Sequence, residues 1–181
     1  MRSLVLTLAL AAAGAASGCT GTLTYPGNTD FQVAPAYDAR RPAEVSVLPV
    51  SGTLEPETAV QLREGLRARL LELRYAPVRL KEVDAHLADY KPGGPRAVME
   101  VRVTKWDDGR LFGDGSLLFS AEVRLFGAGS TEVLFRGTVD EVTVRASSVA
   151  KSMEDRPSTI AQVCAEAAYQ LLDKLPVKGD G

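Results

Sequence analysis

The chain has 181 residues, of which 45% are hydrophobic and 24% are charged, and this balance is typical of one globular domain of ordinary size. Its formal net charge of −2 excludes the strongly basic surface with which proteins bind nucleic acid. Two cysteines are present, Cys19 and Cys164, and because the first is assigned to lipid below, we expect no intrachain disulfide.

The first 18 residues contain the segments of a bacterial export signal in the usual order. Met1 and Arg2 form a short positive region, and residues 4–13 form an apolar stretch. A membrane-spanning helix needs about 20 apolar residues, and this stretch is shorter. The pattern therefore predicts a signal peptide over residues 1–18 that is cleaved rather than kept as an anchor.

Small residues stand directly before the first cysteine. Ala16, Ser17 and Gly18 resemble the recognition site of the lipoprotein signal peptidase, the lipobox, although Leu is commoner where Ala16 stands. The thiol of Cys19 is the nucleophile that such a site modifies with lipid. An ordinary secretory signal cut after Ala15 and a chance cysteine are the less favoured alternatives.

A lipidated Cys19 has consequences for charge and location. Removal of Arg2 lowers the count of Lys and Arg from 21 to 20 against 23 Asp and Glu, so the mature chain has a formal net charge of −3. Membrane lipid becomes a partner of the protein through its anchor. Thr20 stands where many lipoproteins kept at the inner membrane have Asp, which favours the periplasmic face of the outer membrane.

Residues 19–43 are predicted to be the lipidated cysteine and a flexible tether. Thr, Gly, Pro, Asn and Asp dominate the segment without a periodic pattern, and a flexible chain of this length would reach roughly 25 to 30 Å. The aromatic residues Tyr25, Phe31 and Tyr37 could instead pack on the domain. A single domain is then expected over residues 44–177, followed by a disordered tail over residues 178–181.

The first half of the domain alternates strands and helices. Residues 45–50 form a short apolar run typical of a buried strand. Residues 57–75 carry leucines at helical spacing between charged residues, and Pro77 ends the helix. A second strand over residues 78–81 and a short helix over residues 83–90 follow.

The second half predicts three antiparallel strands and a helix. Residues 97–104, 117–125 and 132–144 alternate apolar and polar side chains, and the apolar phase slips near Asp140 and Glu141, which indicates a β-bulge. A final helix begins with Ser158 as its N-cap and ends before Pro176. The fold class is therefore α+β: a mixed sheet of about five strands with three helices packed on it, in the order β-α-β-α-β-β-β-α.

Two short motifs connect this order with a known group. Val45 to Pro49 follows a Val-x-x-Leu-Pro pattern, and Val101 to Trp106 follows Val-x-Val-Thr-x-Trp. Together with the element order they resemble lipoproteins built on a TolB amino-terminal-like domain, over about residues 44–176. That group includes curli-secretion-type lipoproteins and activators of penicillin-binding proteins. The resemblance implies an accessory role in which the domain binds other envelope proteins.

The residues that could carry catalysis or bind metal have simpler interpretations. His86 is predicted to be a solvated surface residue, and Cys164 a small hydrophobic residue of the last helix. Asp107, Asp108 and Asp114 lack the spacing of a calcium loop. Nucleotide-binding and hydrolase motifs are missing from the sequence as well. We therefore expect a protein that is not an enzyme and that uses neither a metal nor a cofactor.

One loop has the composition of a binding surface. Trp106, Arg110, Leu111 and Phe112 lie between two strands and are of the types that dominate interface hot spots. Alternatively, Trp106 covers the sheet edge and Phe112 folds back on the core. The polar loop over residues 146–157 is a second, weaker candidate.

The leading hypothesis is a lipid-anchored periplasmic lipoprotein that binds or scaffolds an envelope transport or assembly complex, with homo-oligomers left open. The alternative is an envelope lipoprotein that binds lipid or another small ligand.

Overall fold

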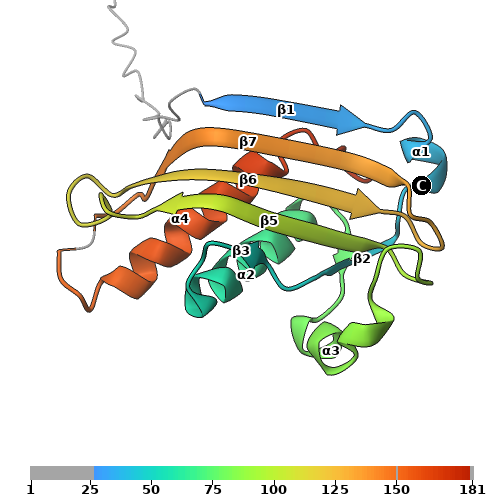
Figure 1. Ribbon diagram of the computed structural model, residues 1–181, viewed down its shortest axis with the longest axis horizontal. Coiled ribbons are helices and arrows are strands. Elements are labelled where there is room, and N and C mark those ends of the chain that lie inside the picture. Colours follow the sequence, from blue (N-terminus) through green and yellow to red (C-terminus); the bar gives the residue numbers. More distant parts are fainter. Residues whose placement is uncertain (1–26, 150, 180–181) are drawn as a thin grey trace, which may run out of the picture.

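The computed structural model describes residues 27–149 and 151–179 as one mixed sheet with helices packed on it (Figure 1). The elements in chain order are β1 (Asn28–Val33), α1 (Tyr37–Arg40), β2 (Glu44–Val47), β3 (Ser51–Gly52), α2 (Pro56–Glu72), β4 (Ala76–Pro77), α3 (Leu80–Ala85), the 3₁₀ helix η1 (Leu87–Asp89), β5 (Val98–Asp107), β6 (Ser116–Phe126), β7 (Val133–Arg145) and α4 (Arg156–Leu171). The sheet has seven strands in the order β1-β7-β6-β5-β2-β4, with β3 paired to β5. The predicted α+β class is confirmed, and the expected count of about five strands is too low.

The centre of the sheet is the antiparallel meander β5-β6-β7 that the alternating sequence predicts. Its apolar side chains point toward α2 and α4, which both lie on the same side of the sheet (Figure 1). The predicted bulge is confirmed, because Ser120 lies where the β6–β7 register shifts and its hydroxyl bonds both bulge residues. Glu141 takes the left-handed backbone conformation there, with φ 53°.

The prediction of a flexible tether through residue 43 is wrong for residues 28–40. Residues 28–33 form β1, which pairs antiparallel with β7 at the sheet edge, and Phe31 stacks on Phe135 with ring centroids 6.3 Å apart. Tyr37 in α1 is buried and its hydroxyl shares a hydrogen bond with Tyr75. The alternative in which these aromatics pack on the domain is therefore the correct one for Phe31 and Tyr37, and Tyr25 lies outside the described residues.

The strand predicted over residues 45–50 is confirmed only for residues 45–47, which lie in β2, and a second short strand, β3, begins at Ser51. Both pair in parallel with β5, and the Leu48 amide still donates to the Met99 carbonyl at 2.9 Å before the chain leaves the sheet. Gly52 has φ 118°, and a Cβ there would lie 1.8 Å from the carbonyl oxygen of Val103. Only glycine allows this close approach of two backbones.

A second, smaller core lies against α3. The buried side chains of this cluster are Val78, Val83, Tyr90, Val98 and Phe126. Alternation places Val98 and Phe126 on the side of the sheet opposite α2 and α4, so the α3 segment covers that side near the sheet edge. The strand predicted over residues 78–81 is wrong, because β4 lies before it at Ala76–Pro77 and residues 80–85 are helical.

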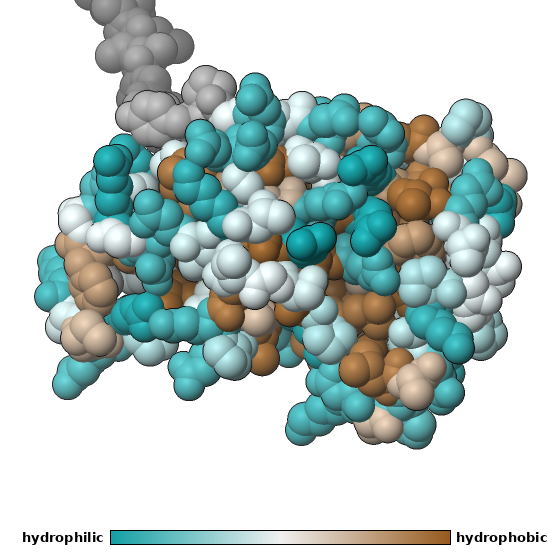
Figure 2. Space-filling view, in the orientation of Figure 1, coloured by the Kyte–Doolittle hydropathy of each residue, from teal (hydrophilic) through white to brown (hydrophobic). Residues whose placement is uncertain are grey.

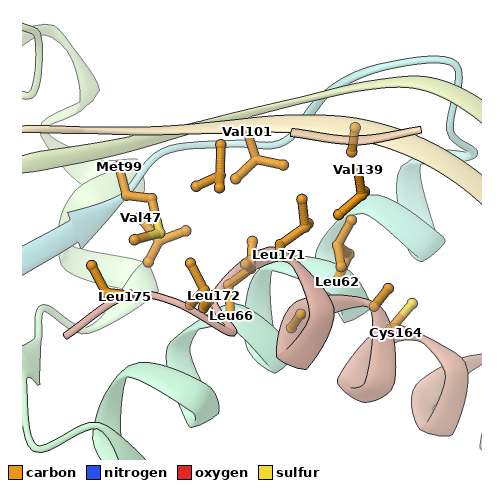
Figure 3. Close-up of a cluster of buried hydrophobic side chains, with 14 of the residues drawn as sticks. Val47, Leu62, Leu66, Met99, Val101, Val139, Cys164, Leu171, Leu172 and Leu175 are labelled. Carbon is orange, nitrogen blue, oxygen red and sulfur yellow. The ribbon is translucent and has the colours of Figure 1, made fainter. Parts of the chain in front are cut away.

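The main core fills the space between the sheet and the pair α2–α4 (Figure 3). Leu62 and Leu66 of α2 meet Leu171 of α4, and all three are fully buried. Burial of one such leucine contributes about 1.5 to 3 kcal/mol relative to exposure. The predicted N-cap Ser158 is wrong, since α4 begins at Arg156 with Pro157 in its first turn and Asp155 as its cap residue.

The end of the described chain is tied to the domain. The Lys178 amide donates to the carbonyl of Leu73 at 2.9 Å, and the Tyr75 hydroxyl donates to the carbonyl of Pro176 at 2.6 Å. The tail expected over residues 178–181 therefore begins with an anchored residue, while residues 180–181 lie outside the described part.

Candidate functional site

The predicted lipidation residue Cys19, with Ala16, Ser17 and Gly18 before it, lies outside the described residues. Lipidation therefore stays a prediction from the sequence. Within residues 27–149 and 151–179, no helix is both long and apolar enough to cross a membrane.

The predicted binding loop is a tightly folded hairpin between β5 and β6. The Asp107 carboxylate accepts from the Gly109 amide at 3.1 Å, and the Asp114 carboxylate accepts from the Ser116 amide at 3.0 Å. Gly115 has φ 71°, which suits glycine at this turn. The Ser116 hydroxyl also donates to Asp114, and these bonds hold the pKa of the Asp114 carboxyl below its usual range.

The four predicted contact residues divide into two pairs. Leu111 is 1% exposed, and Trp106 is half-buried against the core with its ring 6.2 Å from that of Phe119. Arg110 is exposed, and Phe112 is 44% exposed. The prediction of a partner contact through Leu111 is therefore wrong, because this side chain pins the hairpin to the core. The alternative in which Phe112 folds back is wrong as well.

The loop between β7 and α4, which we call the second loop, lies beside this hairpin at the same end of the domain. The Gln162 side chain accepts from the Ser147 hydroxyl at 2.7 Å and from the Ser148 amide at 3.1 Å. A Cβ on Gly115 would lie 3.1 Å from a methyl carbon of Val149, so the two loops are in contact.

An ion pair joins the start of α4 to the hairpin. Arg156, at the start of α4, donates to Asp108 of the hairpin at 3.0 Å and lies 3.7 Å from Glu55. We call the hairpin residues 108–115 together with residues 147–149 and 151–153 the hairpin end.

Two exposed apolar residues of the hairpin end are not predicted by the sequence. Val149 is 38% exposed and Met153 is 71% exposed. They occur in a segment whose composition is polar, and neither is part of a periodic pattern. Only the folded chain brings them to the same end as Phe112.

The side of the sheet opposite α2 and α4 carries a row of alternating charges across β5, β6 and β7, which we call the open sheet face. Arg124 donates to Glu100 at 3.1 Å, and Arg136 donates to Glu122 at 2.8 Å. Hydrophilic side chains cover most of the face seen in Figure 2. Ion pairs this exposed contribute at most about 1 kcal/mol each to stability. The order of the charges therefore matters more for what the face can bind than for folding.

Hollows on this side are lined by both polar and apolar groups. One of about 510 Å³ lies between the end of β1 and the charged row, lined in part by Gln32, Glu122 and Arg136. Another of about 220 Å³ lies beside Pro49, Ser51 and Arg102.

His86 lies at a third hollow of about 470 Å³ beside α3. The ring is exposed, as predicted for a surface histidine, and its Nδ1 is 3.3 Å from the Glu82 carbonyl. Nearby, Arg96 donates to Glu82 at 3.0 Å and to the Tyr90 hydroxyl at 2.7 Å. The Arg96 hydrogen bond holds the pKa of the Glu82 carboxyl below its usual range, which makes this carboxylate a fixed anion rather than a base.

Cys164 lies in the core, where its thiol is 3.8 Å from the Thr58 carbonyl. Burial raises the pKa of the Cys164 thiol to about 12, so it stays protonated and packs as a small hydrophobic group, as predicted. Across the part of the chain that the structure describes, His, Cys, Asp and Glu side chains form no group of three or more that could hold a metal ion.

Comparisons with known proteins find similarity in fold alone. No protein-family model matches the chain, and a search of curated proteins finds no match. Among solved structures, the PelC dodecamer from Paraburkholderia phytofirmans matches with a TM-score of 0.53 at 15% identity, over 85% of this chain and 100% of that one. A dodecamer of a PelC variant with one substitution, in another crystal form, gives 0.54 at 16% identity, over 84% and 100%.

A weaker likeness connects the chain with lipoprotein GNA1162 from Neisseria meningitidis. It has a TM-score of 0.44 at 18% identity, over 72% of this chain and 99% of that one. At these identities the comparisons establish that the domain is similar in fold to PelC.

Proposed function

We propose that this protein is a lipoprotein of the bacterial envelope, anchored through Cys19 to the periplasmic face of the outer membrane, that scaffolds a transport or assembly complex as a homo-oligomer. The observation that carries the proposal is the lipobox-like sequence at Cys19 directly before a domain with the fold of a PelC dodecamer subunit. Lipid on Cys19 would concentrate the domain at a surface, which favours assembly between copies.

A scaffolding role rather than catalysis is supported by the chemistry of the described side chains. The buried thiol of Cys164 is protonated, and His86 is exposed beside a carboxylate that stays ionised. Charged and polar groups make up about half or more of the lining of these two hollows, whereas sites for apolar ligands are lined predominantly by apolar groups.

The open sheet face is the surface that we assign to contacts between proteins in the periplasm. It is broad and carries both signs of charge in a fixed order, and charge order of this kind selects partners and register. Reversing one charge of the row should therefore disturb assembly more than reversing a charge elsewhere.

Native mass spectrometry of the full chain extracted in detergent tests this proposal. We expect a mass several times that of one subunit for the wild type, and smaller species for Arg136→Glu. Lys174→Glu reverses an exposed charge just after α4 and should keep the wild-type mass. A wild type that stays monomeric at every concentration would contradict the assembly, and equal behaviour of both variants would contradict the surface.

A further inference from the structure

We propose that the hairpin end of the domain rests on the membrane that holds Cys19, with Phe112 and Met153 among the lipid headgroups. This orientation of the domain above the bilayer depends on the proposed lipid anchor. Lipid, rather than another protein, is then the partner of the exposed apolar surface at the hairpin end.

The chain enters the domain from the side of the hairpin end. Gly27 packs on the bulge, where an added Cβ would lie 2.5 Å from the Asp140 carbonyl oxygen. From there β1 runs antiparallel to β7, away from the hairpin end (Figure 1).

The length of chain between Cys19 and Gly27 limits how the domain can sit. Eight residues span at most about 28 Å when fully extended. β7 continues five residues beyond Asp140 to the pair Ser116 and Arg145 at the base of the hairpin, which is about 17 Å, and residues 108–115 lie further on. The base of the hairpin end is therefore well within the reach of the chain from Cys19.

The opposite end is a poorer fit to the same length. β7 runs seven residues from Asp140 back to Val133, which is about 23 Å, and the turn over residues 127–130 lies further on. A membrane beneath that turn would consume nearly all of the available chain. The geometry thus favours the hairpin end over the opposite end as the membrane-facing surface.

The hairpin end presents the side chains that a bilayer interface accepts. Phe112, Val149 and Met153 are the exposed apolar residues of this end. Apolar groups on a rigid support enter the headgroup region by about 5 to 10 Å. Leu111, next to Phe112 in the chain, is buried in the main core and supplies that support.

The formal charges of the hairpin end cancel. Its charged residues are Arg110 and Lys151 against Asp108 and Asp114. Contact with lipid should therefore depend on the apolar side chains and change little with the charge of the membrane.

An environment-sensitive fluorophore on introduced cysteines tests the orientation. The full-length lipidated protein is reconstituted into vesicles of phosphatidylethanolamine and phosphatidylglycerol, and separately into phosphatidylcholine vesicles. Labels are placed at Phe112→Cys, at Met153→Cys and, as the control, at Ala128→Cys in the exposed turn at the opposite end. The native Cys164 should not react because its thiol is buried and protonated, and Cys19 carries the lipid.

We expect about threefold less quenching by aqueous iodide at positions 112 and 153 than at 128, in both lipid mixtures, as for groups held within the headgroup layer. Equal quenching at all three positions would overturn the orientation while leaving the anchor intact. Protection that persists in vesicle-free Cys19→Ser protein and grows with its concentration would assign the surface to a second copy. Wild-type protein that carries no lipid on Cys19 would instead contradict the proposed function.

Discussion

Arg63 is a charged residue in the core that joins three elements. It is 6% exposed, and its Nε and one terminal nitrogen donate to the Val47 carbonyl at 2.9 and 2.8 Å, while the other terminal nitrogen donates to Asp84 at 2.6 Å. The side chain thus connects α2 with the end of β2 and with α3. A buried guanidinium is tolerated because its donors are matched by oxygen atoms.

Replacement of Arg63 by Met should lower the free energy of unfolding by about 2 to 3 kcal/mol, because the Val47 carbonyl loses two charged donors in a buried place. Chemical denaturation followed by circular dichroism measures the change. Arg67→Met, at a partly exposed position of the same helix, is the control and should stay within about 0.5 kcal/mol of the wild type. Equal losses for the two variants would contradict the structural role of Arg63.

The hydroxyls of Tyr37 and Tyr75 form a buried pair that connects the amino-terminal segment with the end of α2. Burial, more than any other cause, raises the pKa of both phenols above the ordinary value near 10. In the folded chain the phenols therefore stay protonated at a pH at which unfolded tyrosine ionises.

Stability should consequently fall as the pH rises above about 10, because the unfolded chain loses phenolic protons that the folded chain retains. In Tyr37→Phe this alkaline loss should be shallower, although the variant is about 1 kcal/mol less stable at neutral pH through the missing hydrogen bond. Denaturation midpoints from pH 7 to 11 provide the measurement. An unchanged alkaline slope in Tyr37→Phe would show that the pair does not control it.

At the level of elements, the close contact of α2 with α4 depends on a glycine. A Cβ added at Gly65 would lie 3.0 Å from the Cys164 carbonyl oxygen and 3.3 Å from the Ala165 Cα. The two helices therefore approach each other at a position where a longer side chain would separate them.

Gly65→Leu should destabilise the domain by about 1 to 3 kcal/mol, because overpacking between α2 and α4 outweighs the gain in helix propensity. Ala68→Leu adds a similar side chain on the exposed side of the same helix and should be nearly neutral. Thermal unfolding of the two variants compares these effects. A Gly65→Leu protein as stable as Ala68→Leu would contradict the close packing.

The sequence predicts a strand or helix best where the spacing of its apolar residues matches the side of the element that is buried. The meander β5-β6-β7, its bulge and the two long helices follow from alternation and helical spacing. β1 escapes prediction because it is an edge strand with mostly exposed residues, so it lacks the apolar alternation of a half-buried strand. β4 is only two residues long, which is too short for a periodic signal.

The candidate site is less predictable than the fold for a physical reason. The composition of residues 106–112 identifies an unusual loop, but composition does not reveal that Leu111 points inward while Phe112 stays exposed. Val149 and Met153 join Phe112 only through the contact of two loops that are distant in sequence.

At the scale of the whole molecule, the anchor, the hairpin end and the open sheet face form one arrangement. In our proposals the chain reaches the domain from the membrane side, the hairpin end rests on lipid, and the charged row on β5, β6 and β7 is left for contacts with other proteins. The far end, with the turn over residues 127–130, would then point away from the membrane.

Intact mass spectrometry of membrane-extracted protein tests the anchor most directly. We predict a chain that begins at residue 19 and carries a diacylglyceryl group on Cys19. Cys164→Ser should keep this modification, whereas Cys19→Ser should lose it together with membrane attachment. An unmodified wild-type chain that begins at Ala16, released from the membrane, would contradict the lipid anchor.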